Sequence, residues 1–213
     1  DMDSLCDPST ADVTGHVLEA FGLLMKMSIA GHSDKVPDDL IDRMNLACDR
    51  AVDYLSYNQE STGAWYGRWG SNYIYGTSNV LCGLAYFAAK ETGVIETNDA
   101  VKLSMESGIH WLKSTQNSDG GWGETLMSYK NVKLAGNGPS TASQTAWALM
   151  GLLAYVPVLD KSVQDSVQYL LRTQTMSDDR KEGTWLESQY TGTGFPNHFY
   201  LGYSLYPHYF PMM

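Results

Sequence analysis

The amino-acid sequence predicts an all-α fold built from repeated helix–turn–helix units, and three observations support this prediction. A segment that runs from a glutamine to a tryptophan recurs with a near-constant period, which is typical of repeat architectures. Two kinds of helical segment alternate between these turns, one apolar nearly all round and one apolar on a single face. The chain has 213 residues, of which 43% are hydrophobic, enough to bury a sizeable core. We therefore expect an α/α barrel, or toroid, of alternating inner and outer helices.

The repeated turns combine a glutamine at the end of one helix with a tryptophan that folds back onto that end. The three glutamines are 57 and 58 residues apart in the sequence. In the second turn the intervening segment Ser118–Gly121 contains an aspartate and two glycines, which favour a tight turn. We expect the glutamine amides to bond to backbone groups left free at helix ends, so the turns are interpreted as structural ties. Their residues are Gln59, Trp65, Gln116, Trp122, Gln174 and Trp185.

Caps, prolines and turn residues locate the helical segments in order. We expect helices over residues 11–27, 38–58, 77–90, 98–115, 142–155 and 162–173, with a seventh beginning near Pro196. Helices that follow a tryptophan turn are apolar on nearly all sides and should be inner helices. Helices that precede a glutamine carry charge on one face and should be outer helices. This makes about three and a half helix pairs, fewer than the roughly five to seven of a closed barrel, and predicts an incomplete barrel.

Charge and cysteine content argue against several functional classes. The net charge of −10 disfavours a nucleic-acid surface. Cys6, Cys48 and Cys82 lack CxxC spacing, so we predict neither a disulfide framework nor a metal site, and the sequence suggests no cofactor. The longest apolar run, Ala146–Leu159, is too short to span a bilayer. Attachment of the protein in the plane of a membrane surface stays compatible with the sequence.

Three stretches resemble the squalene–hopene cyclases, a branch of the class II triterpene cyclases. They are residues 12–19 (DVTGHVLE), 67–77 (GRWGSNYIYGT) and 191–203 (TGTGFPNHFYLGY). The glutamine–tryptophan turns resemble the repeat motif of the same family. The resemblance covers the whole chain and implies that residues 1–213 are the C-terminal part of a terpene cyclase α/α-barrel domain. The family's Asp-x-Asp-Asp acid motif does not occur in this sequence, so we expect the chain alone to be inactive and to need the N-terminal part of the same enzyme.

The resemblance implies an intramolecular cyclase, an isomerase of polyprenes. Such an enzyme protonates the terminal alkene of squalene or a similar isoprenoid, closes rings through carbocations, and ends with proton loss or water capture. No metal or cofactor takes part. The resemblance also implies a peripheral or monotopic membrane protein that faces the cytoplasm without a transmembrane helix in this segment, and it allows a homodimer.

The resemblance further assigns roles to individual residues. His16 and Asp12 would be partners of the absent acid motif, with the histidine keeping that acid strongly acidic, and Tyr75 is added to this catalytic group. Aromatic faces would stabilise the cations of the reaction, by about 2 kcal/mol or more per desolvated contact. The predicted cavity residues are Trp69, Tyr73, Phe195, Phe199, Tyr203 and Tyr206. The spacing of the last four predicts that they share one face of a helix. Aromatic residues that only pack in the protein core show the same spacing.

Three other functions are weighed against the cyclase. A protein prenyltransferase β subunit shares the barrel but needs Asp, Cys and His around zinc. A glycosidase needs a carboxylate pair near the aromatics, and Glu124 and Glu187 follow two of the turn tryptophans. A barrel that acts only as a binding scaffold is the third. One departure from the family is Asn197-His198, where typical members have Gly-Asp.

Overall fold

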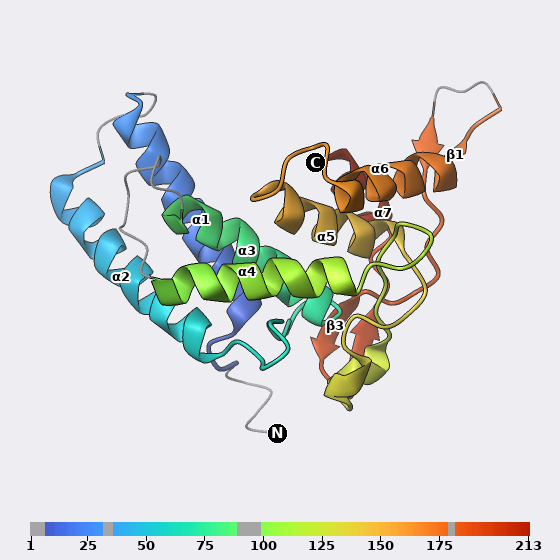
Figure 1. The fold of residues 1–213 in the computed structure, drawn as a ribbon, viewed down its shortest axis with the longest axis horizontal. Coiled ribbons are helices and arrows are strands. Elements are labelled where there is room, and N and C mark those ends of the chain that lie inside the picture. The colour runs from blue at the N-terminus through green and yellow to red at the C-terminus, as the bar shows by residue number, and fades with distance from the viewer. Residues whose placement is uncertain (1–6, 32–35, 89–98, 179–181) are drawn as a thin grey trace.

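The computed structural model describes residues 7–31, 36–88, 99–178 and 182–213 (Figure 1). Its long helices are α1 (Ala11–Ile29), α2 (Asp38–Tyr57), α3 (Tyr73–Ala88), α4 (Asp99–Ser114), α5 (Ala142–Leu153) and α6 (Lys161–Thr173). Shorter helical elements are η2 (Leu126–Tyr129), η3 (Val132–Leu134), α7 (Tyr206–Tyr209) and η4 (Phe210–Met212). Two antiparallel hairpins pair β1 (Thr175–Met176) with β2 (Gly183–Thr184) and β3 (Gly192–Phe195) with β4 (Phe199–Leu201). Cys6 and the ends of the segments predicted at 77–90 and 98–115 that meet residues 89–98 lie outside the described residues.

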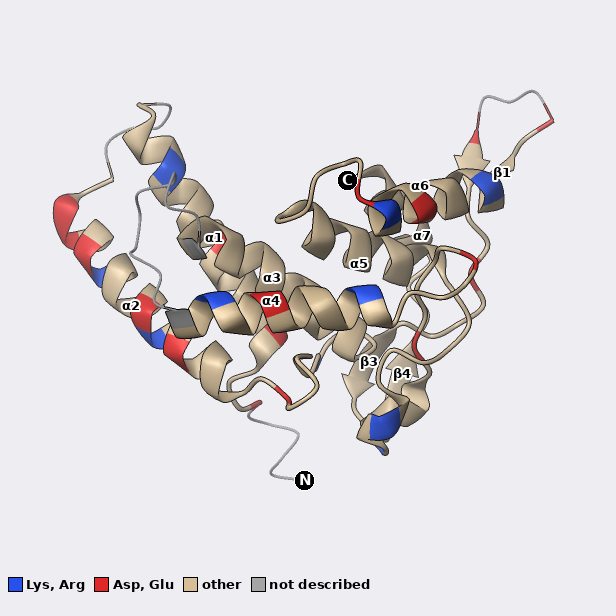
Figure 2. Ribbon diagram, viewed as in Figure 1, with Lys and Arg blue, Asp and Glu red and all other residues tan. Residues whose placement is uncertain are grey.

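The long helices form two layers, as their alternation in the sequence predicts. α1 packs on α3 and α3 packs on α5, while α2 lies against α1, α4 against α3 and α5, and α6 against α5. Figure 2 shows charged residues along the outer helices and few on α3 and α5. The inner helices α1 and α3 approach so closely that a Cβ added to Gly15 would lie 2.6 Å from the carbonyl oxygen of Asn79. The prediction of an all-α fold with inner and outer helices is confirmed.

α3 begins at Tyr73, before the predicted start at Thr77, because a distant carboxylate caps it. Oε2 of Glu124 accepts hydrogen bonds from the backbone N–H groups of Asn72 (3.4 Å) and Ile74 (3.0 Å). A negative group at this position satisfies N–H groups that have no partner within the helix and interacts favourably with the helix dipole. The capping group lies far away in the sequence, so local helix signals place the start too late.

The helix predicted to begin near Pro196 is wrong, because the chain forms the β3–β4 hairpin there. Strand β3 also pairs with the loop before α3, where the backbone N–H of Thr193 donates to the carbonyl of Trp69 at 3.2 Å. The hairpin turn holds Asn197 at φ +69°, a left-handed conformation that asparagine adopts more readily than most residues. Backbone pairing with a distant loop therefore outweighs the helical spacing of the aromatics in this segment.

The tryptophan of each Gln–Trp turn is tied to the outer helix before it. All three indole rings are buried, and each indole N–H donates to a leucine carbonyl in the last turn of that helix. The pairs are Trp65 with Leu55 (2.7 Å), Trp122 with Leu112 (2.8 Å) and Trp185 with Leu170 (2.8 Å). Carbonyls in the last turn of a helix have no regular α-helical partner, and the indole adds a donor to those that capping bonds supply to Leu112 and Leu170.

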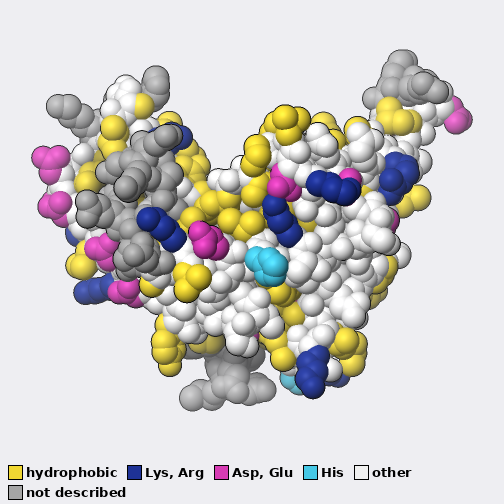
Figure 3. Space-filling model, in the orientation of Figure 1, with side chains coloured by type: hydrophobic (Ala, Val, Ile, Leu, Met, Phe, Trp, Pro, Cys, Tyr) yellow, Lys and Arg dark blue, Asp and Glu magenta, His cyan; other side chains and the backbone are white. Residues whose placement is uncertain are grey.

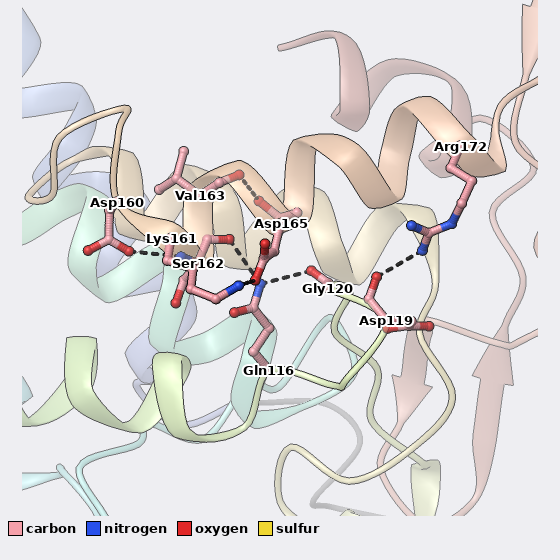
Figure 4. A network of polar contacts seen from close by, with 10 residues as sticks. Gln116, Asp119, Gly120, Asp160, Lys161, Ser162, Val163, Asp165 and Arg172 are labelled. Carbon is pink, nitrogen blue, oxygen red and sulfur yellow. Dashed lines mark hydrogen bonds and ion pairs between the residues drawn. The ribbon is translucent and has the colours of Figure 1, made fainter.

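The glutamine of the second turn reaches forward to the next outer helix, as Figure 4 shows. Nε2 of Gln116 donates to the carbonyl of Gly120 in its own turn and to that of Ser162 at the start of α6, both at 2.9 Å. Gly120 has φ +87°, and a Cβ there would lie 2.5 Å from the backbone oxygen of Asp165. Glycine is required at this position for both reasons. The second turn thus joins the end of α4 to the start of α6.

The first turn repeats this arrangement one unit earlier. Nε2 of Gln59 donates to the carbonyl of Gly63 at 2.8 Å and to the carbonyl of Ser104 in α4 at 2.7 Å. Gly63 has φ +95°, like its counterpart in the second turn. Since each of these two turns bonds backward through its tryptophan and forward through its glutamine, the outer helices α2, α4 and α6 are linked in a chain.

Part of the apolar surface is not covered by any element that the structure describes. Figure 3 shows hydrophobic side chains in the hollow between the end formed by α1 and α2 and the end formed by α5 and α6. On α1, Val13 and Val17 are 44% and 45% exposed. Within the described residues, no helix combines the length and hydropathy that crossing a bilayer requires.

We expect Trp122→Ala to lower the free energy of unfolding by about 3–5 kcal/mol, because it removes a buried ring and the donor to the Leu112 carbonyl. Chemical denaturation of the full-length protein measures this loss. The matched control Leu186→Ala removes a side chain that is 84% exposed in the third turn. It should change the stability by less than about 0.5 kcal/mol. Equal losses in the two variants would contradict the structural role of the tryptophan.

We also expect Glu124→Gln to change how stability depends on pH. Burial raises the pKa of the Glu124 carboxyl, against the opposing effect of its hydrogen bonds to Ser128 and to backbone N–H groups. Folding therefore favours the protonated carboxyl. The stabilising contribution of the protonated carboxyl to the free energy of unfolding is fully present below the ordinary pKa of 4.5. It is lost as the pH rises through the raised pKa of the folded state.

Glu124→Gln keeps a neutral acceptor at the start of α3 and has no such titration. Its stability relative to the wild type should therefore increase as the pH rises from about 4 to about 8. Equilibrium unfolding at several pH values measures the difference. Glu124→Ala removes the acceptor and should be destabilised by about 1–3 kcal/mol at about pH 4, with the same upward trend relative to the wild type as the pH rises, because alanine does not titrate either. Parallel pH profiles of Glu124→Gln and the wild type would count against a raised pKa.

Candidate functional site

Asp12 is fully buried and holds the loop Gly67–Ser71, which leads into α3. Its Oδ2 accepts hydrogen bonds from the backbone N–H groups of Arg68 and Trp69, both at 2.9 Å. Its Oδ1 has no hydrogen-bond partner among the described residues. The carboxylate thus reaches across to a distant loop, and its second oxygen is left available to a further donor. Since an unbonded buried carboxylate oxygen is costly, such a donor would stabilise this region.

Other side chains hold the carbonyls of the same loop. The Tyr129 hydroxyl lies within hydrogen-bond distance of the carbonyls of Gly67 (3.0 Å) and Gly70 (2.8 Å). Nε2 of Gln144, on α5, donates to the carbonyl of Ser71 at 3.1 Å. With its amides and carbonyls bonded on several sides, the loop is a rigid support for the tryptophan that it carries.

His16 and Tyr75 meet across the contact between α1 and α3. Nε2 of His16 lies 3.3 Å from the Tyr75 hydroxyl. Burial raises the pKa of Tyr75, and the negative charge of Asp12 raises it further, so the hydroxyl stays protonated. His16 follows Asp12 by one helical turn and is otherwise exposed. The structure therefore brings the three predicted catalytic residues into one region.

Tyr75 forms one end of an aromatic cluster that continues to the C-terminal helices. Its ring centroid lies 4.8 Å from that of Trp147, which lies 5.7 Å from Tyr206 and 5.3 Å from Phe210. Tyr206 in turn stacks on Tyr203 at 4.5 Å. Sequence reasoning missed Trp147 because it sits in an apolar segment that reads as core. It missed Phe210 because that residue lies beyond the matched motif.

Phe199, in β4, and Tyr203, just after β4, pack over two glycines of strand β3. A Cβ added to Gly194 would lie 2.5 Å from the Phe199 ring, and one added to Gly192 would lie 2.2 Å from the Tyr203 ring. The register shifts between Thr193 and Phe195, and the lack of side chains at Gly192 and Gly194 makes room for both rings. The single helix face predicted for the four C-terminal aromatics is therefore wrong. These aromatics are Phe195, Phe199, Tyr203 and Tyr206.

Tyr73 belongs to a separate, buried aromatic group. It is 5% exposed, and its ring centroid lies 5.9 Å from that of Tyr66, which lies 5.7 Å from Tyr129. Burial raises the pKa of both Tyr73 and Tyr66 to about 12. Although Tyr73 and Tyr75 are close in the sequence, the first turn of α3 directs them into different surroundings.

Two hollows adjoin Arg68 and Trp69. The first, of about 430 Å³, lies between α1 and α2. Its lining includes Val13, Val17, Phe21, Cys48 and Trp69. The second, of about 730 Å³, shares the segment from Asp7 to Thr10 with the first. Its lining includes Tyr54, Tyr66, Arg68, Phe195 and His198. Predicted cavity aromatics thus border both hollows.

The carboxylates and cysteines do not support the rival enzymes. Oε2 of Glu187 accepts from the backbone N–H of Ser143 at the start of α5 (3.0 Å), as Glu124 does at α3. Both carboxylates therefore cap helices and do not form a free acid–base pair. In the part of the chain that the structure describes, no three His, Cys, Asp or Glu side chains gather as a metal site would need.

Comparisons with known proteins agree with the resemblance of the motifs. A family model described as "Squalene-hopene cyclase C-terminal domain" matches residues 1–213. A squalene hopane cyclase from Aspergillus fumigatus is 45% identical over 210 residues, which cover 90% of this chain and 28% of that protein. A terpene cyclase–glycosyl transferase fusion protein from Humicola fuscoatra is 44% identical over 212 residues, which cover 99% of this chain and 15% of that protein.

The fold also resembles a solved structure. The ent-copalyl diphosphate synthase from Streptomyces platensis aligns with a TM-score of 0.59 and 18% identity over 92% of this chain and 31% of that one. At this identity the likeness concerns the fold alone. The chain spans less than a third of each of these proteins. Because the family model matches it from end to end, the chain belongs to the squalene-hopene cyclase C-terminal domain family.

Proposed function

We propose that this chain is the C-terminal part of a squalene–hopene-type cyclase. The complete enzyme would protonate a linear polyprene such as squalene and close it into a polycyclic triterpene through carbocations. The observation that carries this proposal is the meeting of Asp12, His16 and Tyr75 beside an extended aromatic cluster. A carbocation needs negative potential without a nucleophile, and aromatic faces supply it. Residues 1–213 would form the C-terminal part of its α/α-barrel domain.

The acid that protonates the alkene would come from the N-terminal part of the same enzyme. His16 bonds to the Tyr75 hydroxyl on one side and is exposed on the other, where that acid could approach it. A protonated histidine lowers the pKa of a neighbouring carboxylic acid and so favours proton transfer to the alkene.

The partly exposed aromatics would form the wall against which the polyene folds. Trp69 and Phe195 are each 43% exposed, Phe199 is 51% exposed and Tyr203 is 41% exposed, so their rings are available to a substrate. Tyr206 would support the wall through its stack on Tyr203. Tyr73 would not touch the substrate, because it is buried in the separate group with Tyr66 and Tyr129.

The Gln–Trp turns would act as ties between helices and take no part in the chemistry. Their amide and indole groups bond to backbone carbonyls, which supports a structural role for Gln59, Gln116, Trp65, Trp122 and Trp185. Gln174 would serve the third turn in the same way. Cyclisation of a polyene is strongly exothermic, and such ties would resist local opening of the barrel.

The uncovered apolar surface supports two further proposals about partners. The exposed Val13 and Val17 on α1 would pack against the N-terminal part of the enzyme. Val158 and Leu159, 68% and 77% exposed between α5 and α6, would attach the protein peripherally or monotopically to the cytoplasmic face of a membrane. Flotation with phospholipid vesicles, compared with the variant Val158→Ser/Leu159→Ser, tests the attachment. The homodimer stays a prediction, and analytical ultracentrifugation of the full-length enzyme would measure its molar mass in solution.

In the full-length enzyme supplied with squalene, we expect Phe199→Ala and His16→Ala to fail in different ways. Phe199→Ala leaves the acid intact but removes an aromatic face after the first proton is delivered, so partly cyclised products should accumulate. His16→Ala weakens the initiating acid, so all products should fall by about tenfold or more, with their ratios kept. Product analysis by gas chromatography and mass spectrometry measures both effects.

The matched control for these variants is Tyr57→Ala, which removes an aromatic side chain that is 89% exposed at the end of α2. It should leave both the amount and the ratio of products unchanged. Truncated rings from His16→Ala, or an equal loss of every product from Phe199→Ala, would reverse the assigned roles. A full-length wild-type protein that makes no cyclic hydrocarbon from squalene or a longer or shorter polyprene would favour the binding scaffold.

A further inference from the structure

Arg68 is a buried arginine to which neither the motif nor the proposed chemistry assigns a role. Its side chain is 9% exposed. The guanidinium carbon lies 4.4 Å from the ring centroid of Trp69 and 5.8 Å from that of Phe195. The two rings belong to segments far apart in the sequence, the loop before α3 and strand β3. Arg68 is therefore the side chain that contacts both rings where these segments meet.

Asp7 holds the guanidinium from its edge. Oδ1 of Asp7 lies 3.3 Å from Nε and 3.2 Å from Nη2 of Arg68. A planar guanidinium bonds along its edge and stacks on its face at the same time, which the compact ammonium of lysine does not do. The carboxylate thus takes the edge of Arg68 and leaves its face to the aromatic rings.

The backbones that carry the two rings are already fixed by other contacts. Asp12 accepts from the amides of Arg68 and Trp69, and the amide of Thr193 donates to the carbonyl of Trp69. What these contacts leave undetermined is the rotation of the two rings about their side-chain bonds. Both rings are 43% exposed, so a packed core does not enclose them.

We propose that Arg68 is a positioning residue, which sets the orientation in which Trp69 and Phe195 face the substrate. This inference rests on the cyclase function proposed above. The positive charge of Arg68, if unpaired, would repel and destabilise a nearby carbocation and would weaken the negative potential of the ring faces. Its pairing with Asp7 offsets that charge, so the ion pair supplies a flat stacking surface at little net charge.

The test uses Arg68→Lys in the full-length protein, because this variant keeps the charge and loses the planar group. We expect the share of partly cyclised products from squalene to rise by about tenfold, the size expected for a misdirected aromatic face. The matched control is Arg172→Lys. Arg172 lies on α6, with its guanidinium carbon 6.0 Å from the ring centroid of Tyr169 and its Nη2 donating to the carbonyl of Asp119. Its replacement should leave the product ratio unchanged.

A second measurement reports the ring directly and does not need activity. In protein labelled with 5-fluorotryptophan, the ¹⁹F resonance that Trp69→Phe removes belongs to Trp69. Arg68→Lys should shift or broaden this resonance, while Arg172→Lys should leave it in place. Asp7→Asn removes the charged partner from the edge of the guanidinium and disturbs the structure less than Arg68→Lys does. It should move the Trp69 resonance in the same direction as Arg68→Lys.

The two measurements separate this proposal from the cyclase function. If the wild type makes no cyclic product, the cyclase function fails, and the Trp69 resonance alone decides whether Arg68 orients the ring. If the wild type cyclises squalene, both the product ratio and the resonance must respond to Arg68→Lys. The proposal is overturned if Arg68→Lys keeps the wild-type product ratio. It is also overturned if neither Arg68→Lys nor Asp7→Asn moves the Trp69 resonance.

Discussion

The buried carboxylate of Asp12 is the contact on which the arrangement of the candidate site depends. One of its oxygens binds two consecutive amides of the loop before α3, and a charged acceptor forms stronger hydrogen bonds than a neutral one. That loop in turn pairs with strand β3 through the carbonyl of Trp69. Helix α1, the start of α3 and the C-terminal hairpin are therefore joined through a few polar contacts, in a region otherwise packed by apolar and aromatic side chains.

Features that repeat or that alternate along the chain could be predicted from the sequence alone. The glutamine–tryptophan turns gave the period, and the contrast between apolar and one-sided helices separated inner from outer layers. The start of α3 and the hairpin at Pro196 could not be found in this way. Glu124 and the loop at Trp69 determine them from distant parts of the chain, and local propensities contain no information about such partners.

The candidate site shows the same division between local pattern and tertiary contact. The motifs identified Asp12, His16 and Tyr75, which the structure brings together. The spacing of the C-terminal aromatics suggested a helix face, whereas Phe199 packs over Gly194 on a hairpin. Trp147 reads as an ordinary core residue in the sequence, and only its contact with Tyr75 reveals that it borders this region.

The third Gln–Trp turn differs from the others in a way that matters for engineering. Its indole bond to the preceding helix spans 15 residues, against 10 in the first and second turns, yet the bond length is 2.8 Å. The extra residues belong to the exposed β1–β2 hairpin, which projects from the helical layers. The bond from the Trp185 indole to the Leu170 carbonyl therefore does not depend on the length of the segment between them. This hairpin is therefore a suitable insertion point for an affinity tag or a fluorescent reporter peptide, because its strands are largely exposed and the indole bond already forms across the longer segment.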